Sequence, residues 1–150
     1  MEPEHSPGGE RYLVGMVLGE YYAVPARFIG EIALFDKVYP LPLLPDYVLG
    51  IINRYSAPYA LLDTGLLLAG RPGQGAKVLV LKETSPHGSD SIALLIDDVL
   101  DIVEIPSSEQ VPVEGDTDGL VAASFPWKGK NTLVLDIRGI ITRAAGDIAV

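Results

Sequence analysis

The stretch Tyr12-Leu-Val-Gly-Met-Val-Leu-Gly-Glu-Tyr-Tyr-Ala-Val24 decides the fold of this chain. Residues 12–18 form an apolar run of strand length. Gly19-Glu20 interrupts that run, and residues 21–24 resume it. Two apolar runs separated by a Gly-containing break predict a β-hairpin.

Similar short apolar runs follow along the rest of the chain. The strongest cover residues 28–34, 51–55, 59–62, 77–82, 91–96, 120–127 and 132–137. Some nine or ten strands with turns every few residues are typical of barrels or a sandwich rather than of alternating β-α-β units. The expected fold class is therefore all-β. We expect few helices: one turn at 46–50, a short helix from Asp63 stopped by Gly70, and a short terminal helix from Ile140.

The third run places Ile29 and Glu31 on one strand face and Phe28, Gly30 and Ile32 on the other. A charge beside an aliphatic residue indicates an exposed side, so Ile29 and Glu31 are candidates for an interface. Burial of Ile29 in the core is the alternative.

Composition narrows the possible functions. The 150 residues carry a net charge of −9 and no cysteine. A strongly acidic protein repels nucleic acid and anionic membrane surfaces, and the lack of thiols excludes disulfides and thiolate metal sites. No apolar run is long enough to span a membrane as a helix. Residues 1–11 are expected to be a flexible tail with no secretion signal.

The chain contains no recognisable reaction centre. His5 and His87 lack a second base or ligand at a useful spacing. Asp97, Asp98 and Asp101 lack the spacing of a calcium loop, so solubility or capping at strand ends is the favoured interpretation over a metal site. We therefore expect no catalytic residue, no metal and no cofactor, and a function that depends on contacts with partners.

The order of these segments resembles the CheW-like family of adaptors over about residues 12 to 143. Five segments carry most of the resemblance: 12–24, 29–32, 41–53, 61–63 and 94–102. The closing pieces 119–120 and 133–137 fall where the last hairpin of the family lies. The resemblance implies two packed five-stranded SH3-like barrels. It also implies two partners, the cytoplasmic tip of a chemoreceptor, bound in a groove between the lobes, and a CheA-type histidine kinase.

Carried over by position, the resemblance gives six partner-binding residues. Ile29 and Glu31 would lie on the receptor-facing strand, and Ile92 and Leu94 would line the other side of the groove. Asn53 and Tyr55 would lie near the turn that is commonly Asn-Leu-Arg-Gly.

That turn departs from the family pattern. It reads Asn53-Arg54-Tyr55-Ser56, so that Tyr55 stands for the usual Arg and Ser56 for the Gly. Arg54 comes one place too early, on the opposite strand face, and is not expected to replace that Arg.

The sequence thus predicts a single two-lobed domain over residues 12–145, followed by a tail at 146–150. The expected function is a cytoplasmic, non-enzymatic adaptor in chemotaxis or a related pathway such as pilus control. A barrel that binds a small molecule or a peptide, having lost the usual contacts, is the alternative that the altered turn leaves open.

Overall fold

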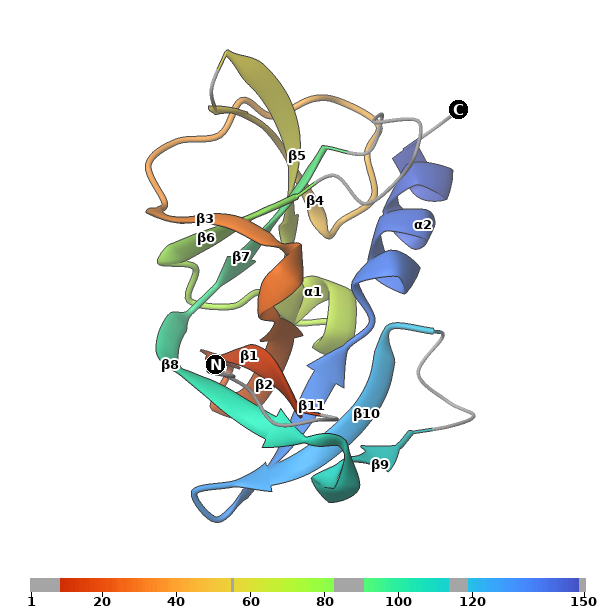
Figure 1. Cartoon of the computed structure of the whole chain (residues 1–150). Helices are drawn as coiled ribbons and strands as arrows, with labels where there is room; N and C mark the ends of the chain where they lie inside the picture. The colour runs from red at the N-terminus through yellow and green to blue at the C-terminus, as the bar shows by residue number, and fades with distance from the viewer. Residues whose placement is uncertain (1–8, 55, 83–90, 114–118, 149–150) are drawn as a thin grey trace.

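The computed structural model describes residues 9–54, 56–82, 91–113 and 119–148 (Figure 1). Eleven strands in this described part form two sheets, which confirms the all-β prediction. The chain starts in the first sheet, crosses to the second for residues 29–96 and then returns to the first. Each sheet is therefore the basis of one lobe.

The first sheet is built from the first two strands and the last four strands of the chain. Its strand order is β8 (Asp98–Pro106), β1 (Gly9–Val17), β2 (Glu20–Pro25), β11 (Lys130–Leu135), β10 (Val121–Trp127) and β9 (Val111–Pro112). The β1–β2 pair is the predicted opening hairpin, with Leu13 opposite Val24. β1 begins at Gly9, so residues 9–11, expected in the tail, are part of the sheet.

The second sheet is continuous in sequence. Its order is β3 (Ile29–Leu34), β6 (Lys77–Leu81), β7 (Ile92–Ile96), β5 (Ala57–Asp63) and β4 (Val48–Arg54). Its outermost strands are thus β3 and β4. Neighbouring strands are antiparallel except β5 with β7, and β2 with β11 in the first sheet.

Two α-helices and two 3-10 turns complete the fold. The 3-10 turns are η1 (Ala26–Phe28) and η2 (Ser107–Glu109), and the helices are α1 (Thr64–Ala69) and α2 (Ile137–Ile148). The Asp63 carboxylate caps α1 by accepting from the N–H of Leu66 at 3.2 Å, and Gly70 ends the helix in the left-handed conformation, as predicted.

The terminal helix is longer than expected at both ends. Asp136 accepts from the N–H of Gly139 at 2.9 Å, which caps the helix and lets it begin at Ile137. At its other end α2 continues to Ile148, through residues expected to be a tail. The terminal helix itself was predicted correctly.

The predicted helical turn at 46–50 is wrong. Asp46 and Tyr47 form a turn, but β4 begins at Val48, and Gly50 pairs with Leu61 of β5. Pairing with a neighbouring strand satisfies these backbone groups and overrides the local helix signal.

The two lobes share a core. The largest apolar cluster combines Leu13 and Val24 of the first sheet, Leu79 and Leu94 of the second, and Ile140 of α2. Each lobe also has its own smaller cluster, around Phe125 in the first and around Leu61 in the second. Adjacent residues such as Leu13 and Val14 belong to different clusters, so central strands are buried on both faces. The lobes consequently pack as one unit.

Candidate partner-binding site

The two edge strands of the second sheet are joined to each other. β3 and β4 stand at opposite ends of the strand order, yet the Arg54 guanidinium contacts the Glu31 carboxylate. Arg54 Nε lies 3.1 Å from Glu31 Oε1, and a second contact joins Nη2 to Oε2. This ion pair closes one end of the seam between the edges.

A backbone pair closes the other end of the same seam. Tyr39, in the segment after β3, donates to the carbonyl of Ile51 at 2.8 Å and accepts from its N–H at 2.9 Å. Gly50 makes this contact possible, because a Cβ there would lie 2.3 Å from the Tyr39 carbonyl oxygen. The segment between β3 and β4 is thereby fixed against β4.

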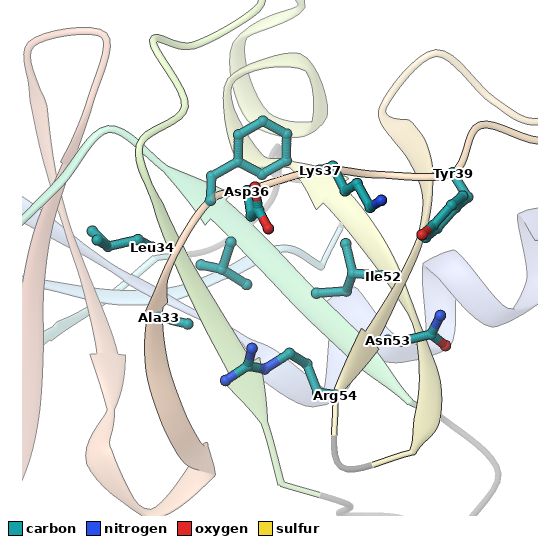
Figure 2. A pocket seen from close by; sticks show the side chains of 10 residues that line it. Ala33, Leu34, Asp36, Lys37, Tyr39, Ile52, Asn53 and Arg54 are labelled. Atoms are coloured by element: carbon teal, nitrogen blue, oxygen red, sulfur yellow. The ribbon is translucent and has the colours of Figure 1, made fainter.

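Between these two links lies a cavity of about 160 Å³, which we call the seam cavity (Figure 2). Apolar side chains of Ala33, Ile52 and Val78 line it, and Val78 also belongs to the core of the second lobe. Asp36 and Lys37 lie at its rim, and the Asp36 carboxylate points toward the cavity in Figure 2. A hydrogen bond with Tyr39 raises the pKa of Lys37 above its usual range, so its ammonium stays charged.

The face of β3 is the reverse of the one expected. Ile32 and Leu34 are 42% and 73% exposed, whereas Ile29 and Glu31 are half-buried. Ile29 packs against the main core, and a register shift between Ile29 and Glu31 changes the alternation. The prediction that Ile29 and Glu31 mark the exposed side is therefore wrong.

The other predicted site residues fall into different environments. Asn53 is exposed and lines the seam cavity. Ile92 and Leu94 are 4% and 0% exposed and belong to the shared core, so their side chains are not offered to a partner. Tyr55 lies outside the described residues.

Arg54 is the residue that the sequence argument missed. It was expected to face away from the site, but it shares the face of Ile52 and reaches Glu31 across the seam. The opposite charges of the two residues were the available signal. The sequence carries no local signal for the sheet curvature that brings the edge strands β3 and β4 together.

The aspartates at the start of β8 bind nearby backbone N–H groups and a lysine. Asp97 accepts from the N–H groups of Leu18, Gln74 and Gly75 at 2.8, 2.7 and 3.1 Å. Asp98 pairs with Lys77 at 2.9 Å, a contact that lowers the pKa of its carboxyl. The contacts of Asp97 agree with the capping interpretation, whereas Asp98 forms an ion pair. Among the described residues no group of side chains could hold a metal ion, and both histidines lie outside them.

Comparison with known proteins gives the family. A family model, "CheW-like domain", matches residues 11–145. Among matching solved structures is the scaffolding protein TtCheW from Thermoanaerobacter tengcongensis, with a TM-score of 0.73 and 17% identity, covering 84% of this chain and 88% of that one. No curated protein matches. None of the described helices is long and apolar enough to cross a membrane. The structural match shows the two-lobed SH3-like fold, and because the family model spans most of the sequence, the chain belongs to the CheW-like domain family.

Proposed function

We propose that this protein is a non-enzymatic signalling adaptor that couples the cytoplasmic tip of a chemoreceptor to a CheA-type histidine kinase. The match of the CheW-like family model to residues 11–145 carries the proposal. The pathway would be chemotaxis or a related chemosensory system, and the protein would act in the cytoplasm, where receptor tips and kinases meet.

The architecture supports a role in contact rather than catalysis. The lobes share a core that holds their outer surfaces in a fixed relation, which lowers the entropy lost when a partner binds. Several large apolar side chains are nevertheless exposed, among them Leu34 and Leu43. On β3, Ile32 and Leu34 are both exposed on the same strand face, and adjacent exposed apolar residues are a mark of protein–protein contact.

We assign the receptor contact to the seam between β3 and β4. Glu31 and Arg54 present a fixed charge pair there, and Asn53 adds an exposed amide beside it. Ile29, Ile92 and Leu94 would then shape the strands from within the core. Tyr55 follows Arg54 directly in the chain and belongs to the same proposed contact.

The direct test is a titration of the full chain with a receptor cytoplasmic fragment and with the kinase. Glu31→Arg should weaken receptor binding about tenfold or more, as expected when a central charged contact is reversed. Glu109→Arg is the matched control, because it changes the net charge equally at an exposed site on the other lobe.

A further variant separates contact from local structure. The double variant Glu31→Arg with Arg54→Glu keeps an ion pair across the seam but exchanges its charges. If the receptor contacts the Glu31 carboxylate directly, the double variant should still bind the receptor weakly, although its ion pair restores the local fold. Wild-type protein that binds neither partner would refute the adaptor proposal.

A further inference from the structure

The seam cavity reaches the core of the second lobe. Ala33, Ile52 and Val78 line it, and all three belong to or pack against the apolar cluster of that lobe. Ile52 and Val78 are 6% and 3% exposed, so one wall of the cavity is part of the core itself. Protein interiors are close-packed, and a space of about 160 Å³ beside core side chains is one in which an apolar group gains dispersion contacts.

The rim of the cavity carries charges of both signs side by side. Asp36 and Lys37 are consecutive and exposed, and both line the cavity. Figure 2 shows the Asp36 carboxylate directed toward the cavity. Lys37 Nζ lies 5.2 Å from the centre of the Tyr39 ring, an arrangement in which the ring attracts the ammonium and holds it at the rim. An anion and a cation are thus presented together above an apolar wall.

The charge pattern excludes most simple ligands. Arg54, which also lines the cavity, is paired with Glu31 within the chain. A ligand with a single charge would be repelled by either Asp36 or Lys37, because the two have opposite signs. A ligand that carries both an ammonium and a carboxylate can be bound by both residues. Asn53 adds an exposed amide that can donate to the carboxylate or accept from the ammonium.

The volume of the cavity limits the size of the ligand. A molecule in liquid water occupies about 30 Å³, so the cavity corresponds to roughly five water molecules. An aliphatic side chain of about three or four carbons suits such a space. The charged groups attached to that side chain would stay at the solvent-exposed rim, where the cost of removing them from water is small.

We propose that the seam cavity binds a free aliphatic α-amino acid of the valine, leucine or isoleucine type. The side chain of the ligand fills the cavity against Ile52 and Val78. Its ammonium pairs with Asp36, and its carboxylate pairs with Lys37. This site does not require the adaptor role. If the receptor contacts Glu31, a condition that rests on the proposed function, the amino acid lies beside that contact and alters receptor binding.

Isothermal titration calorimetry of the full chain with L-valine, L-leucine and L-isoleucine tests the site. At least one of them should bind at a single site. Leucinamide lacks the carboxylate and isocaproate lacks the ammonium, so each should bind roughly tenfold more weakly than leucine or worse. Glycine, which has no side chain to fill the cavity, should not bind measurably. Failure of all three amino acids to bind, or equal binding of leucine and either analogue, overturns the proposal.

Charge variants test the two rim residues. Asp36→Asn and Lys37→Gln should each weaken binding roughly tenfold or more, because each removes one charged contact with the ligand. Both residues are exposed, so the variants should fold. Glu109→Gln and Lys128→Gln are the matched controls, because they make the same changes of charge at exposed sites of the other lobe. Unchanged affinity in Asp36→Asn or in Lys37→Gln overturns the assignment.

The absence of cysteine allows a test of the location. Asn53→Cys places a single thiol at the wall of the cavity, and bound leucine should slow its reaction with a water-soluble thiol reagent. Lys128→Cys, at an exposed turn of the other lobe, should react at the same rate with and without leucine. Leucine that binds the Asn53→Cys chain without protecting its thiol lies elsewhere, and the proposal fails.

Titrations with the receptor fragment and the kinase distinguish this site from the adaptor role. A wild type that binds leucine but neither partner refutes the proposed function and leaves the amino-acid site standing. A wild type that binds both partners but none of the three amino acids leaves the adaptor role standing and overturns the amino-acid site.

Discussion

Arg54 and Glu31 connect the two outermost strands of the second sheet, with Nε of the guanidinium 3.1 Å from Oε1 of the carboxylate. In the described residues no backbone ladder joins β3 to β4. The Arg54–Glu31 ion pair therefore links these two strands in place of backbone hydrogen bonds. The position of this pair explains why the second lobe is closed at one end of the seam and hollow in the middle.

Reversing either charge of this pair should lower stability modestly. The side chains of Arg54 and Glu31 are 36% and 23% exposed, so solvent screens them and we expect a loss of about 0.5–1 kcal/mol for Glu31→Arg or Arg54→Glu. The double exchange should recover most of it. Urea unfolding of the four proteins gives the coupling energy as a double-mutant cycle. Losses that simply add would show that the pair does not close the seam.

Gly50→Ala should disturb the seam more strongly. The new Cβ would lie 2.3 Å from the Tyr39 carbonyl oxygen, and the φ of +145° also disfavours a side chain. We expect a loss of at least about 2 kcal/mol. Gly146→Ala is the control, because nothing lies within 4 Å of that position in α2. It should be neutral or stabilising by up to about 1 kcal/mol. Equal urea midpoints for the two variants would contradict this account.

Asp97→Ala should be far more damaging than Asp101→Ala. Asp97 accepts three backbone N–H groups and ties the β1–β2 turn of one lobe to the 74–75 segment of the other. Leaving these donors without their acceptor should cost about 3 kcal/mol. Asp101 is exposed and, within the described part of the chain, accepts only from the N–H of Ile102, so its loss should stay within about 0.5 kcal/mol. Thermal unfolding of both variants compares them, and similar midpoints would show that Asp97 does not link the lobes.

The sequence was sufficient for strands and hairpins because their signals are local. The Gly19-Glu20 break and the apolar runs on either side specify the first hairpin, and the structure has it. Asp63 and Gly70 specify α1 in the same way. These signals depend on neighbours in the chain, which a sequence displays directly.

The faces of the strands were harder to predict, for a physical reason. In β1, Leu13 faces the shared core and Val14 faces the core of its own lobe, so the apolar run does not alternate. In β3, a register shift lies between Ile29 and Glu31, and Ile29 packs against the shared core. The positions of Ile29, Glu31 and Arg54 depend on long-range packing and on sheet curvature, neither of which leaves a local pattern.

The contact of α2 with the second lobe should make stability depend on pH at both extremes. Tyr47, in the turn before β4, donates its hydroxyl to Asp147 Oδ2 at 2.5 Å, and Arg143 Nε lies 3.1 Å from the same oxygen. Burial, followed by the hydrogen bond to Asp147, raises the pKa of Tyr47 to about 12. Hydrogen bonds from Tyr47 and Arg143 lower the pKa of Asp147.

In alkali, the unfolded chain loses the Tyr47 proton near its ordinary pKa of 10.0, while the folded protein keeps it until about 12. The folded state then binds more protons, so the contribution of Tyr47 to stability is complete below pH 10 and is lost as the pH rises toward 12. Urea unfolding of the wild type and of Tyr47→Phe across this range isolates the effect. Tyr47→Phe should be about 1 kcal/mol less stable near neutral pH, and the difference should shrink in alkali.

In acid, the sign is the opposite. The pKa of Asp147 is lower in the folded state than its ordinary 3.8, so its contribution is present above that value and is lost as the pH falls through the folded pKa. Asp147→Asn should therefore lose less stability between neutral and acidic pH than the wild type does. Because this carboxylate is also the acceptor for Tyr47, the same variant should reduce the alkaline loss of stability without removing it, since burial is the larger cause of the raised pKa. If Asp147→Asn changed stability in acid alone, burial would account for the whole of the raised Tyr47 pKa, and the contact that fastens α2 to the second lobe would add nothing to it.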